Sequence, residues 1–258
     1  MISSYLTHFF RAGNEHSIHS PFVFDLYTQV IRPPKKISTE FKEIEALRRK
    51  LLKVNDEIEI LDLGAGSRRH SSNRRKISTI VKNAEKPAHF GELFYRLTRH
   101  FQPQTILELG TSLGLTTGYF AAAAPKSRLV TMEGCPETAR LALENFKTLN
   151  FPDIQCVVGN IDQTLPKWVA EQEQLVDMAF FDANHRYEPT IRYFNEVMKK
   201  ASSQAVFIFD DIYWSDEMKQ AWEYIKAQPD VTVTIDLFWI GLVFFRKEQV
   251  KENFVLRF

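Results

Sequence analysis

The stretch TILELGTSLGLTTG, Thr105 to Gly118, predicts the fold of this chain of 258 residues. It opens as a buried strand, bends through a turn bracketed by Gly110 and Gly114, and continues as a helix. That order lets the backbone approach a nucleotide-like ligand, with the N-terminus of the helix facing it. The following strand-like run, RLVTME, ends in Glu133, where a carboxylate is placed to hold ribose hydroxyls. We therefore expect a nucleoside cofactor at this turn.

A similar stretch, EIEILDLGAGSRR, occurs earlier in the chain at residues 57–69. After Gly64 and Gly66 it continues as SRRHSSNRRK, which is too basic and too polar for a helix packed on a sheet. No strand follows about twenty residues later, where the ribose-binding acid would have to be. We expect this stretch to be an irregular insert. The basic residues at 68–76 are typical of a solvated loop; the alternatives are an anion-binding lid or an RNA contact.

From Thr105 onward, apolar runs alternate with amphipathic segments, which predicts right-handed βαβ crossovers and a parallel sheet covered on both faces. The predicted strands are 105–109, 128–133, 154–158, 176–182 and 205–211, and the predicted helices are 113–124, 136–149, 164–174, 188–200 and 215–228. Two closely spaced strand-like runs at 231–247 predict an antiparallel hairpin. The predicted class is α/β, a doubly wound, seven-stranded and mostly parallel sheet.

The first part of the chain does not follow this alternation and reads mostly as helix. Ser20-Pro21 and Ser38-Thr39 are typical helix starts, and RPPKK at 32–36 is a predicted joint. We predict two domains. Residues 1–86 form a helical cap or lid that carries the basic glycine-turn loop, and residues 87–258 form the cofactor-binding domain.

Composition limits the classes of function. The net charge of +1 gives no overall field that would favour nucleic acid or a membrane. Two cysteines without a CxxC pattern indicate a reducing compartment and no zinc or disulfide framework. There is no apolar run near the ~20 residues of a membrane span, and the first residues lack the apolar core of a secretory signal. We expect a cytoplasmic protein.

The glycines Gly110, Gly114 and Gly118 have a GxxxG spacing that differs from the GxGxxG pattern of NAD-binding folds. With this spacing, the motifs ILELGTSLGLTTGYFA, VTMEGCPETARLALENF, FFDANHRYE and FIFDDIYW resemble the class I S-adenosylmethionine-dependent methyltransferases. The closer likeness is to the small-molecule O-methyltransferases typified by the catechol and caffeoyl-coenzyme A enzymes. It extends over roughly 87–247 and implies a Rossmann-like methyltransferase fold and S-adenosylmethionine as cofactor.

The resemblance also implies a set of cofactor-binding residues. These are Glu108, Gly110, Thr111, Ser112, Gly114, Glu133, Asn160 and Asp182. The turn residues would flank the aminoacid end of the cofactor, Glu133 would accept both ribose hydroxyls, and Asn160 would lie at the adenine edge. The alternative for Glu108 and Glu133 is that acids at strand ends simply face solvent.

Three aspartates follow the fourth and fifth predicted strands: Asp182, Asp210 and Asp211. The carboxyl ends of neighbouring parallel strands converge, and three carboxylates suit Mg²⁺ or another divalent cation. In the metal-dependent relatives that the chain resembles, an Asp-Asn pair stands at the place of Asp210 and Asp211. A lysine three places after the aspartate that corresponds to Asp182 acts there as base. Here that place is His185, whose ordinary pKa of ~6.5 suits a base. We predict catalytic roles for Asp182 and His185. Alternatively, these two only hold the loop and Asp211 caps the next helix.

The predicted function is O-methylation of a hydroxyl on a small molecule that is aromatic or carries an anionic group. Aromatic residues near the expected site, which alternatively belong to the core, are Tyr187, Tyr213, Trp214, Phe238 and Trp239. Three alternatives remain: methylation of RNA or protein through the 68–76 loop, S-adenosylmethionine binding without catalysis, and a dehydrogenase. We expect no membrane or nucleic-acid partner, and a homodimer through the cap.

Overall fold

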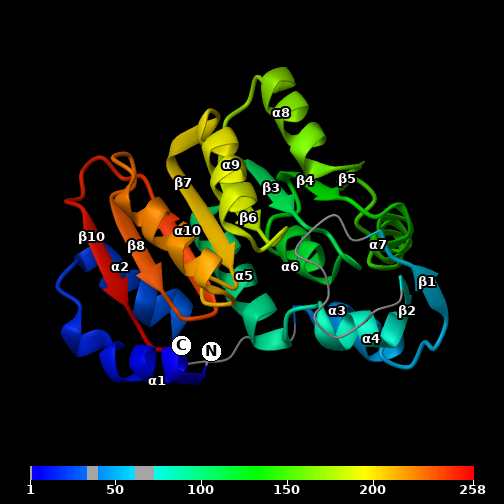
Figure 1. The fold of residues 1–258 in the computed structure, drawn as a ribbon, viewed down its shortest axis with the longest axis horizontal. Helices are drawn as coiled ribbons and strands as arrows, with labels where there is room; N and C mark the ends of the chain where they lie inside the picture. Colours follow the sequence, from blue (N-terminus) through cyan, green and yellow to red (C-terminus); the bar gives the residue numbers. More distant parts are fainter. Residues whose placement is uncertain (1, 34–39, 62–72) are drawn as a thin grey trace. The chain divides into compact units, whose positions relative to one another are not determined.

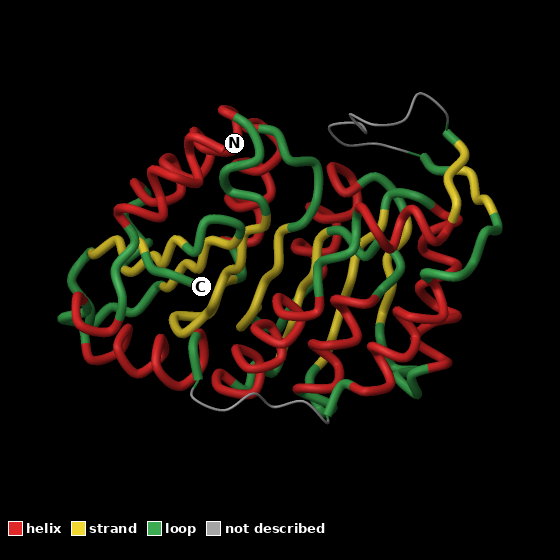
Figure 2. The backbone as a smooth tube through the Cα atoms, turned by 90° about the horizontal axis from the view of Figure 1, so that it is seen from below, coloured by secondary structure: helices red, strands yellow, loops and turns green. Residues whose placement is uncertain are grey.

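The computed structural model describes residues 2–33, 40–61 and 73–258 (Figures 1 and 2). The chain packs as two compact units, one made of Met1–Pro34 with Trp168–Phe258 and the other of Lys35–Lys167. The predicted division into a cap, residues 1–86, and a cofactor-binding domain, residues 87–258, is a division by function and stays a prediction.

The unit 35–167 contains the glycine turn and the segment that precedes it. Its helices are α3 (Lys42–Leu51), α4 (Ile77–Asn83), α5 (Ala88–Phe101), α6 (Leu115–Ala123), α7 (Pro136–Thr148) and most of α8 (Ile161–Glu171). Its strands are β1 (Glu57–Glu59), β2 (Arg74–Lys76), β3 (Thr105–Leu109), β4 (Arg128–Glu133) and β5 (Gln155–Val158). Strands β3, β4 and β5 pair parallel in that order, and every residue of β3 is buried. A strand covered on both faces reads as the continuous apolar run seen in the sequence.

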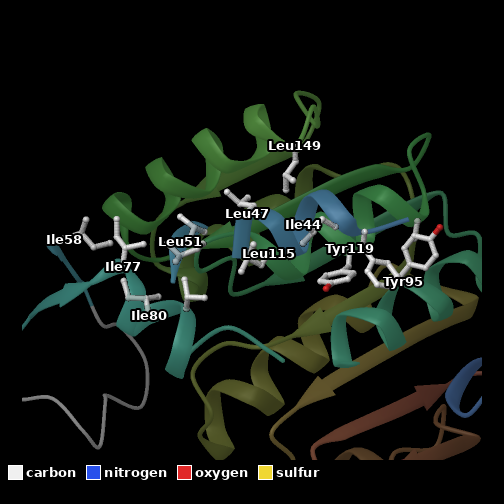
Figure 3. Packing of buried hydrophobic residues seen from close by; sticks show 14 residues of the cluster. Ile44, Leu47, Leu51, Ile58, Ile77, Ile80, Tyr95, Leu115, Tyr119 and Leu149 are labelled. Carbon is white, nitrogen blue, oxygen red and sulfur yellow. The ribbon is translucent and has the colours of Figure 1, made fainter. Parts of the chain in front are cut away.

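A hydrophobic cluster joins the early helices of this unit to the helices that follow β3 (Figure 3). Helix α3 contributes Ile44, Leu47 and Leu51, which lie on one face because they recur at helical spacing. They pack with Leu115 and Tyr119 of α6. The Tyr119 hydroxyl also donates a hydrogen bond of 2.5 Å to Glu45 of α3. These contacts hold the segment before β3 against the helix that starts at the glycine turn.

The other unit contains the second half of the alternating pattern and the N-terminal helices. Its helical segments are α1 (Ile2–Arg11), η1 (Glu15–Ser17), α2 (Pro21–Leu26), η2 (Tyr27–Ile31), α9 (Tyr187–Met198) and α10 (Asp216–Ala227). Its strands are β6 (Val176–Phe181), β7 (Ala201–Asp210), β8 (Val233–Asp236), β9 (Ile240–Phe244) and β10 (Glu252–Val255). Strand β9 is antiparallel to both β7 and β8, while β6 is parallel to β7 and β10 is parallel to β8. Strands β6, β7, β8 and β10 therefore have their carboxyl ends at one edge.

The predicted α/β class, the predicted strands 105–109, 128–133, 154–158, 176–182 and 205–211, and the C-terminal hairpin of β8 and β9 are confirmed. The predicted strand number is wrong: the central sheet has eight strands, because β10 pairs with β8. A four-residue edge strand in a mixed sequence has no strong local signal, since only its partner stabilises it. The predicted helix start at Ser20 is confirmed, because its side chain accepts a hydrogen bond from the Val23 N–H. The start at 38–39 lies outside the described residues.

The expectation of a solvated loop at 68–76 is wrong for its described part, residues 74–76. They form β2, which is antiparallel to β1 in a separate two-stranded sheet. Residues 62–72, with both glycines of the earlier stretch, lie outside the described residues. None of the helices within the described residues combines the length and the apolarity needed to cross a membrane.

Candidate functional site

The turn after β3 has the geometry that the sequence predicts. Gly110, Ser112 and Gly114 have positive φ angles of 99°, 49° and 79°, respectively. A side chain is strained in that conformation, and a Cβ atom on Gly114 would also overlap the Phe146 ring. The turn leads directly into α6, so backbone N–H groups at the start of that helix face outward beyond the strand.

Glu108 lies beneath this turn and is fully buried. Its Oε2 accepts hydrogen bonds from the hydroxyls of Thr117, at 2.5 Å, and Thr131, at 2.7 Å. Thr131 in turn lies 2.6 Å from the Thr111 hydroxyl. The carboxylate therefore ties β3 to β4 and α6. The alternative that it faces solvent is wrong, whereas its predicted contact with the cofactor stays a prediction.

Glu133, at the end of β4, holds the same turn from the other side. Its Oε2 accepts a hydrogen bond of 2.8 Å from the Ser112 N–H, and its Oε1 accepts one of 2.8 Å from the Cys135 N–H. Burial raises the pKa of Glu133, against the lowering effect of these N–H groups. Each oxygen has a second lone pair, so the carboxylate keeps acceptor capacity for a ligand hydroxyl. The structure thus brings together two of the predicted cofactor residues, Ser112 and Glu133.

Glu85 is a buried acid that the sequence analysis missed. Its Oε1 accepts a hydrogen bond of 2.8 Å from the Leu113 N–H, next to the residue that donates to Glu133. Burial raises the pKa of Glu85, and the nearby Glu133 adds to that effect, while the Leu113 N–H opposes it. Two carboxylates therefore face the same turn. Glu85 follows α4 in the polar run NAEKP, where no pattern distinguishes it from an exposed residue.

Asn160, predicted at the adenine edge, lies just before α8. Its side-chain Oδ1 accepts a hydrogen bond of 3.0 Å from the Asp162 N–H, so it caps the start of that helix. The preceding Gly159 donates its N–H to the Glu133 carbonyl at 2.9 Å. Asn160 is thereby placed two residues beyond the end of β5, the strand paired with β4. Its contact with the cofactor stays a prediction.

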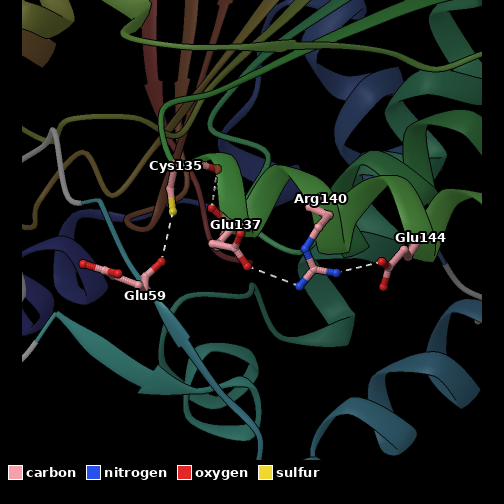
Figure 4. A network of polar contacts seen from close by, with 6 residues as sticks. Glu59, Cys135, Glu137, Arg140 and Glu144 are labelled. Carbon is pink, nitrogen blue, oxygen red and sulfur yellow. Dashed lines mark hydrogen bonds and ion pairs between the residues drawn. The ribbon is translucent and has the colours of Figure 1, made fainter.

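The earlier stretch is anchored beside Glu133 through Cys135 (Figure 4). The Cys135 sulfur lies 3.5 Å from the Glu59 carbonyl and 3.3 Å from the Leu61 N–H, which donates to it. Farther along α7, Arg140 bridges Glu137 and Glu144. Of the basic residues at 68–76, the structure describes only those of β2, where Arg74 pairs with Glu57 at 3.6 Å. The predicted anion-binding or polymer-binding role of this loop stays a prediction.

The second group of predicted residues lies in the other unit, at the carboxyl ends of β6 and β7. Asp182, His185 and Asp210 each place one ligand-type atom within 4.8 Å of the others. His185 Nε2 lies 3.3 Å from Asp182 Oδ1, and Asp210 is 1% exposed. The parallel pairing of β6 with β7 is what brings these separate motifs together.

Asp211 lies outside this group of three among the described residues. It has a positive φ of 52°, donates its N–H to the Trp239 carbonyl at 2.7 Å, and accepts from the Trp214 N–H at 2.8 Å. It therefore shapes the turn after β7. The cap of α10 is Ser215, whose side chain accepts from the Met218 N–H, and the alternative role of Asp211 as that cap is wrong.

The electrostatics of the group change the role expected of His185. Burial lowers the pKa of His185, but the hydrogen bond that it donates to Asp182 and the charges of Asp182, Asp210 and Asp211 outweigh this effect and raise the pKa to about 9. The imidazole is thus mostly protonated at neutral pH. The expectation that His185 keeps an ordinary pKa is wrong, because it considered the residue without its neighbours.

The same group suits a divalent cation. Two carboxylates and an imidazole supply converging donor atoms, and carboxylate oxygens are preferred by Mg²⁺. The imidazole widens the choice to transition metals such as Mn²⁺. The group contains two of the three predicted metal ligands, Asp182 and Asp210, and His185 in place of Asp211, and metal binding by these residues stays a prediction.

The aromatic residues predicted near the acceptor differ in burial, as Phe238 and Tyr213 illustrate. Phe238 is 2% exposed, has a positive φ of 71° and stacks on Tyr213 at 4.9 Å between ring centroids. It is a core residue, as the alternative stated. Tyr213 is half-buried and donates its hydroxyl to Asp236 at 2.7 Å.

Comparisons with known proteins agree with this geometry. Residues 107–212 match a family model described as a methyltransferase domain. The chain is 31% identical to a catechol O-methyltransferase of Niastella koreensis over 47% of its length and 55% of the relative's. It is 28% identical to one of Mycobacterium tuberculosis, over 55% of this chain and 61% of the relative. It thus spans about half to three-fifths of these curated relatives.

Among solved structures, an O-methyltransferase from Bacillus cereus in complex with S-adenosylhomocysteine has a similar fold. The TM-score is 0.57 with 19% identity, over 86% of this chain and 97% of that chain. At that identity the likeness shows the fold alone. The resemblance read from the motifs is confirmed: residues 107–212 match a methyltransferase domain, and the chain has the Rossmann-like fold of the class I S-adenosylmethionine-dependent methyltransferases.

Proposed function

We propose that this protein transfers the methyl group of S-adenosylmethionine to a hydroxyl of a small molecule. The observation that carries the proposal is the convergence of Asp182, His185 and Asp210 at the carboxyl ends of β6 and β7, within the matched methyltransferase domain. Ligands of open α/β sheets bind beyond those ends. The names of the relatives, catechol O-methyltransferases, support a hydroxyl as the acceptor.

The cofactor is held by the turn after β3 in this proposal. Glu133 has acceptor capacity for the ribose hydroxyls, and the first turn of α6, which has no side-chain cap, offers backbone N–H groups to the carboxylate of the aminoacid end. Glu85, with its buried carboxyl beside Leu113, adds an acceptor for the ammonium group of that end. Methyl transfer is an in-line displacement from a good leaving group, so alignment by these contacts supplies much of the rate.

The acceptor hydroxyl must lose its proton, and in this proposal the group of Asp182, His185 and Asp210 assists that loss. At neutral pH His185 holds a proton on the imidazole, which orients toward Asp182. Neutralising the charge of Asp182 and Asp210 lowers the pKa of His185 and makes it a proton acceptor. A divalent cation bound by Asp182 and Asp210 would lower the pKa of a coordinated hydroxyl and orient it.

The finer features of the acceptor and of the assembly are also proposed. Tyr213, half-buried beside the end of β7, offers a ring face for an aromatic acceptor. A homodimer is supported by apolar side chains exposed on α1, of which Phe10 is 80% exposed and Leu6 50%. Light scattering of the purified protein measures the oligomeric state. The cytoplasmic location stays a prediction.

Calorimetry with S-adenosylhomocysteine, with and without Mg²⁺, followed by turnover of catechol and related acceptors, tests the proposal. We expect binding of the cofactor product and a methylated acceptor. Asp182→Asn should lower kcat by about 10²-fold or more, as expected when a group that handles the proton is lost. Asp177→Asn is the matched control, because Asp177 lies at the amino end of the same strand.

Failure to bind S-adenosylhomocysteine would contradict the proposed cofactor. Binding without turnover of any acceptor, unchanged by Asp182→Asn, would favour the alternative of a non-catalytic S-adenosylmethionine-binding protein.

A further inference from the structure

A cavity of about 240 Å³ lies within the unit that holds Asp182 and Asp210, and no predicted role accounts for it. Its lining consists of Ser4, Thr7, His8, Arg11, Tyr213, Lys219 and Val255. Two of these side chains, Arg11 and Lys219, are cations, and no lining residue is an acid. A concave surface with this composition attracts an anion.

The two cations differ in how they are neutralised. Lys219 pairs with Asp216 at 2.9 Å on the same helix. Arg11, at the end of α1, forms no hydrogen bond or ion pair within residues 2–33, 40–61 and 73–258. A guanidinium presents its N–H donors in a planar fork that matches a carboxylate or phosphate in a bidentate manner. Arg11 is therefore the side chain of this cavity with donors left for a ligand.

Two further lining residues, His8 and Tyr213, are held in place by one buried acid. Asp236, 3% exposed, lies 3.0 Å from His8 Nε2 and accepts hydrogen bonds from the Tyr213 hydroxyl at 2.7 Å and the Phe238 N–H at 2.8 Å. Both carboxylate oxygens of Asp236 thus have partners within the protein. His8 and Tyr213 form a fixed wall, which lowers the cost of ordering the site when a ligand binds.

The cavity opens at the sheet edge where the acidic group lies. Asp236 and Val255 face each other at the carboxyl ends of β8 and β10. Strand β8 runs in the same direction as β7 and β6, because β7 and β8 are both antiparallel to β9. The ends of β6 and β7 carry Asp182 and Asp210. One edge of this unit therefore bears both the acidic group and the cationic cavity.

The chain also limits the distance between them. Tyr213 lines the cavity and follows Asp210 by three residues. Three residues span at most ~11 Å between Cα atoms, even when fully extended. The wall of the cavity at Tyr213 therefore lies close to Asp210, and an acceptor that passes Tyr213 would connect the two places.

We infer that this cavity is the subsite for an oxyanion on the methyl acceptor, a carboxylate or a phosphate, bound by Arg11 with Lys219 beside it. The inference rests on the proposed function and adds the class of acceptor. The acceptor is an aromatic hydroxy acid or aryl phosphate whose hydroxyl lies at the Asp182–Asp210 group while its anionic group lies at Arg11.

Steady-state methylation of three probes tests the inference: catechol, 3,4-dihydroxybenzoate and a catechol that carries a phosphate group. In the wild-type protein we expect a lower KM for the anionic probe that fits, and the two anionic probes tell carboxylate from phosphate. Arg11→Ala should raise the KM of that probe by about 10- to 100-fold relative to catechol, as expected for loss of a charge-assisted hydrogen bond. Arg11→Lys should restore part of the loss, and Arg49→Ala, an exposed arginine on α3, is the matched control.

Equal changes in KM for neutral and anionic probes, or no change, would overturn the subsite. If the wild-type protein methylates none of the probes, the proposed function fails, and calorimetric titration of 3,4-dihydroxybenzoate and of the phosphate probe then decides on the subsite separately. Binding of either probe that weakens at least tenfold in Arg11→Ala supports it. Absent binding of both, or binding of equal strength in the two proteins, rejects it.

Discussion

Strands β1 and β3 come from similar sequence, EIEILDLG at residues 57–64 and TILELG at 105–110, and have different surroundings. β3 is buried throughout and pairs parallel with β4, which delivers Glu133 to the turn. β1 has only Ile58 buried and pairs with β2 in a separate sheet of two strands. A run of apolar residues is therefore compatible with a buried strand of the central sheet and with a strand of a separate two-stranded sheet. What differs is the chain that follows: a helix-forming segment and a second apolar strand after β3, and a basic polar segment after β1.

Among substitutions that test this comparison, we expect the largest loss of stability from one at the turn after β3. Gly114→Ala should destabilise folding by about 3 kcal/mol or more, because the φ of 79° is strained for alanine and the added Cβ would overlap Phe146. Denaturant unfolding measures it. Gly118→Ala is the control: it lies inside α6 with ordinary φ, its nearest Cβ neighbour is Leu149 at 3.3 Å, and its cost should be under about 1 kcal/mol. Equal losses in the two variants would contradict the strain.

The next effect compares acids of the two strands. Glu108→Ala should cost about 2–4 kcal/mol of stability, because it leaves the hydroxyls of Thr117 and Thr131 without their buried acceptor. Glu59→Ala on β1 should change stability by about 0.5 kcal/mol or less, since that side chain is exposed. A loss at Glu59 as large as the one at Glu108 would show that β1 is as integral to the fold as β3.

Affinity for S-adenosylhomocysteine should also depend on β4, the neighbour of β3. Glu133→Gln should weaken S-adenosylhomocysteine binding by about 10- to 100-fold, because the amide cannot accept both ribose hydroxyls as a carboxylate does. Calorimetry measures it. The control is Glu137→Gln, an acid on α7 paired with Arg140 at the surface, for which we expect less than about a twofold change. Unchanged affinity in Glu133→Gln would move the cofactor away from β4.

A further prediction concerns the pKa of His185, because the parallel pairing of β6 with β7 brings this side chain close to Asp182 and Asp210. With a folded pKa of about 9, against ~6.5 in the unfolded chain, protonated His185 stabilises the native state. That stabilisation is complete below the unfolded value and is lost as the pH rises through about 9. NMR titration of His185 measures the pKa, and Asp182→Asn should lower it because it removes the hydrogen bond and the charge. A pKa near 6.5 in the metal-free protein would contradict the convergence of the three side chains.

The smallest effect belongs to the separate sheet. Arg74→Ala removes the ion pair with Glu57, whose two side chains are 68% and 45% exposed, and should cost less than about 0.5 kcal/mol in thermal or denaturant unfolding. A loss above about 1 kcal/mol would show that the sheet of β1 and β2 supports the fold more strongly than its exposure indicates.

Much of the site was predictable because strand ends can be read from sequence. Glu133, Asp182 and Asp210 each lie at the end of an apolar run, and the parallel pairing of β6 with β7 brings Asp182 and Asp210 together. Glu85 was not predictable, since burial of an acid depends on what packs over it. The raised pKa of His185 was also missed, because it depends on the hydrogen bond with Asp182 in the folded loop and on the charges of Asp182, Asp210 and Asp211, the last two at the end of a different strand.

The sequence alone determined the α/β class, the strands β3 to β9, the glycine turn and the acids at the strand ends, because periodicity and turn residues act over a few neighbouring positions. Only the tertiary structure decided that β10 joins the sheet, that β1 and β2 form a separate one, and that His8, Arg11 and Tyr213 line one cavity. These features join residues far apart in the chain. Their free energy comes from burial, pairing and charge between distant segments, which no local pattern encodes.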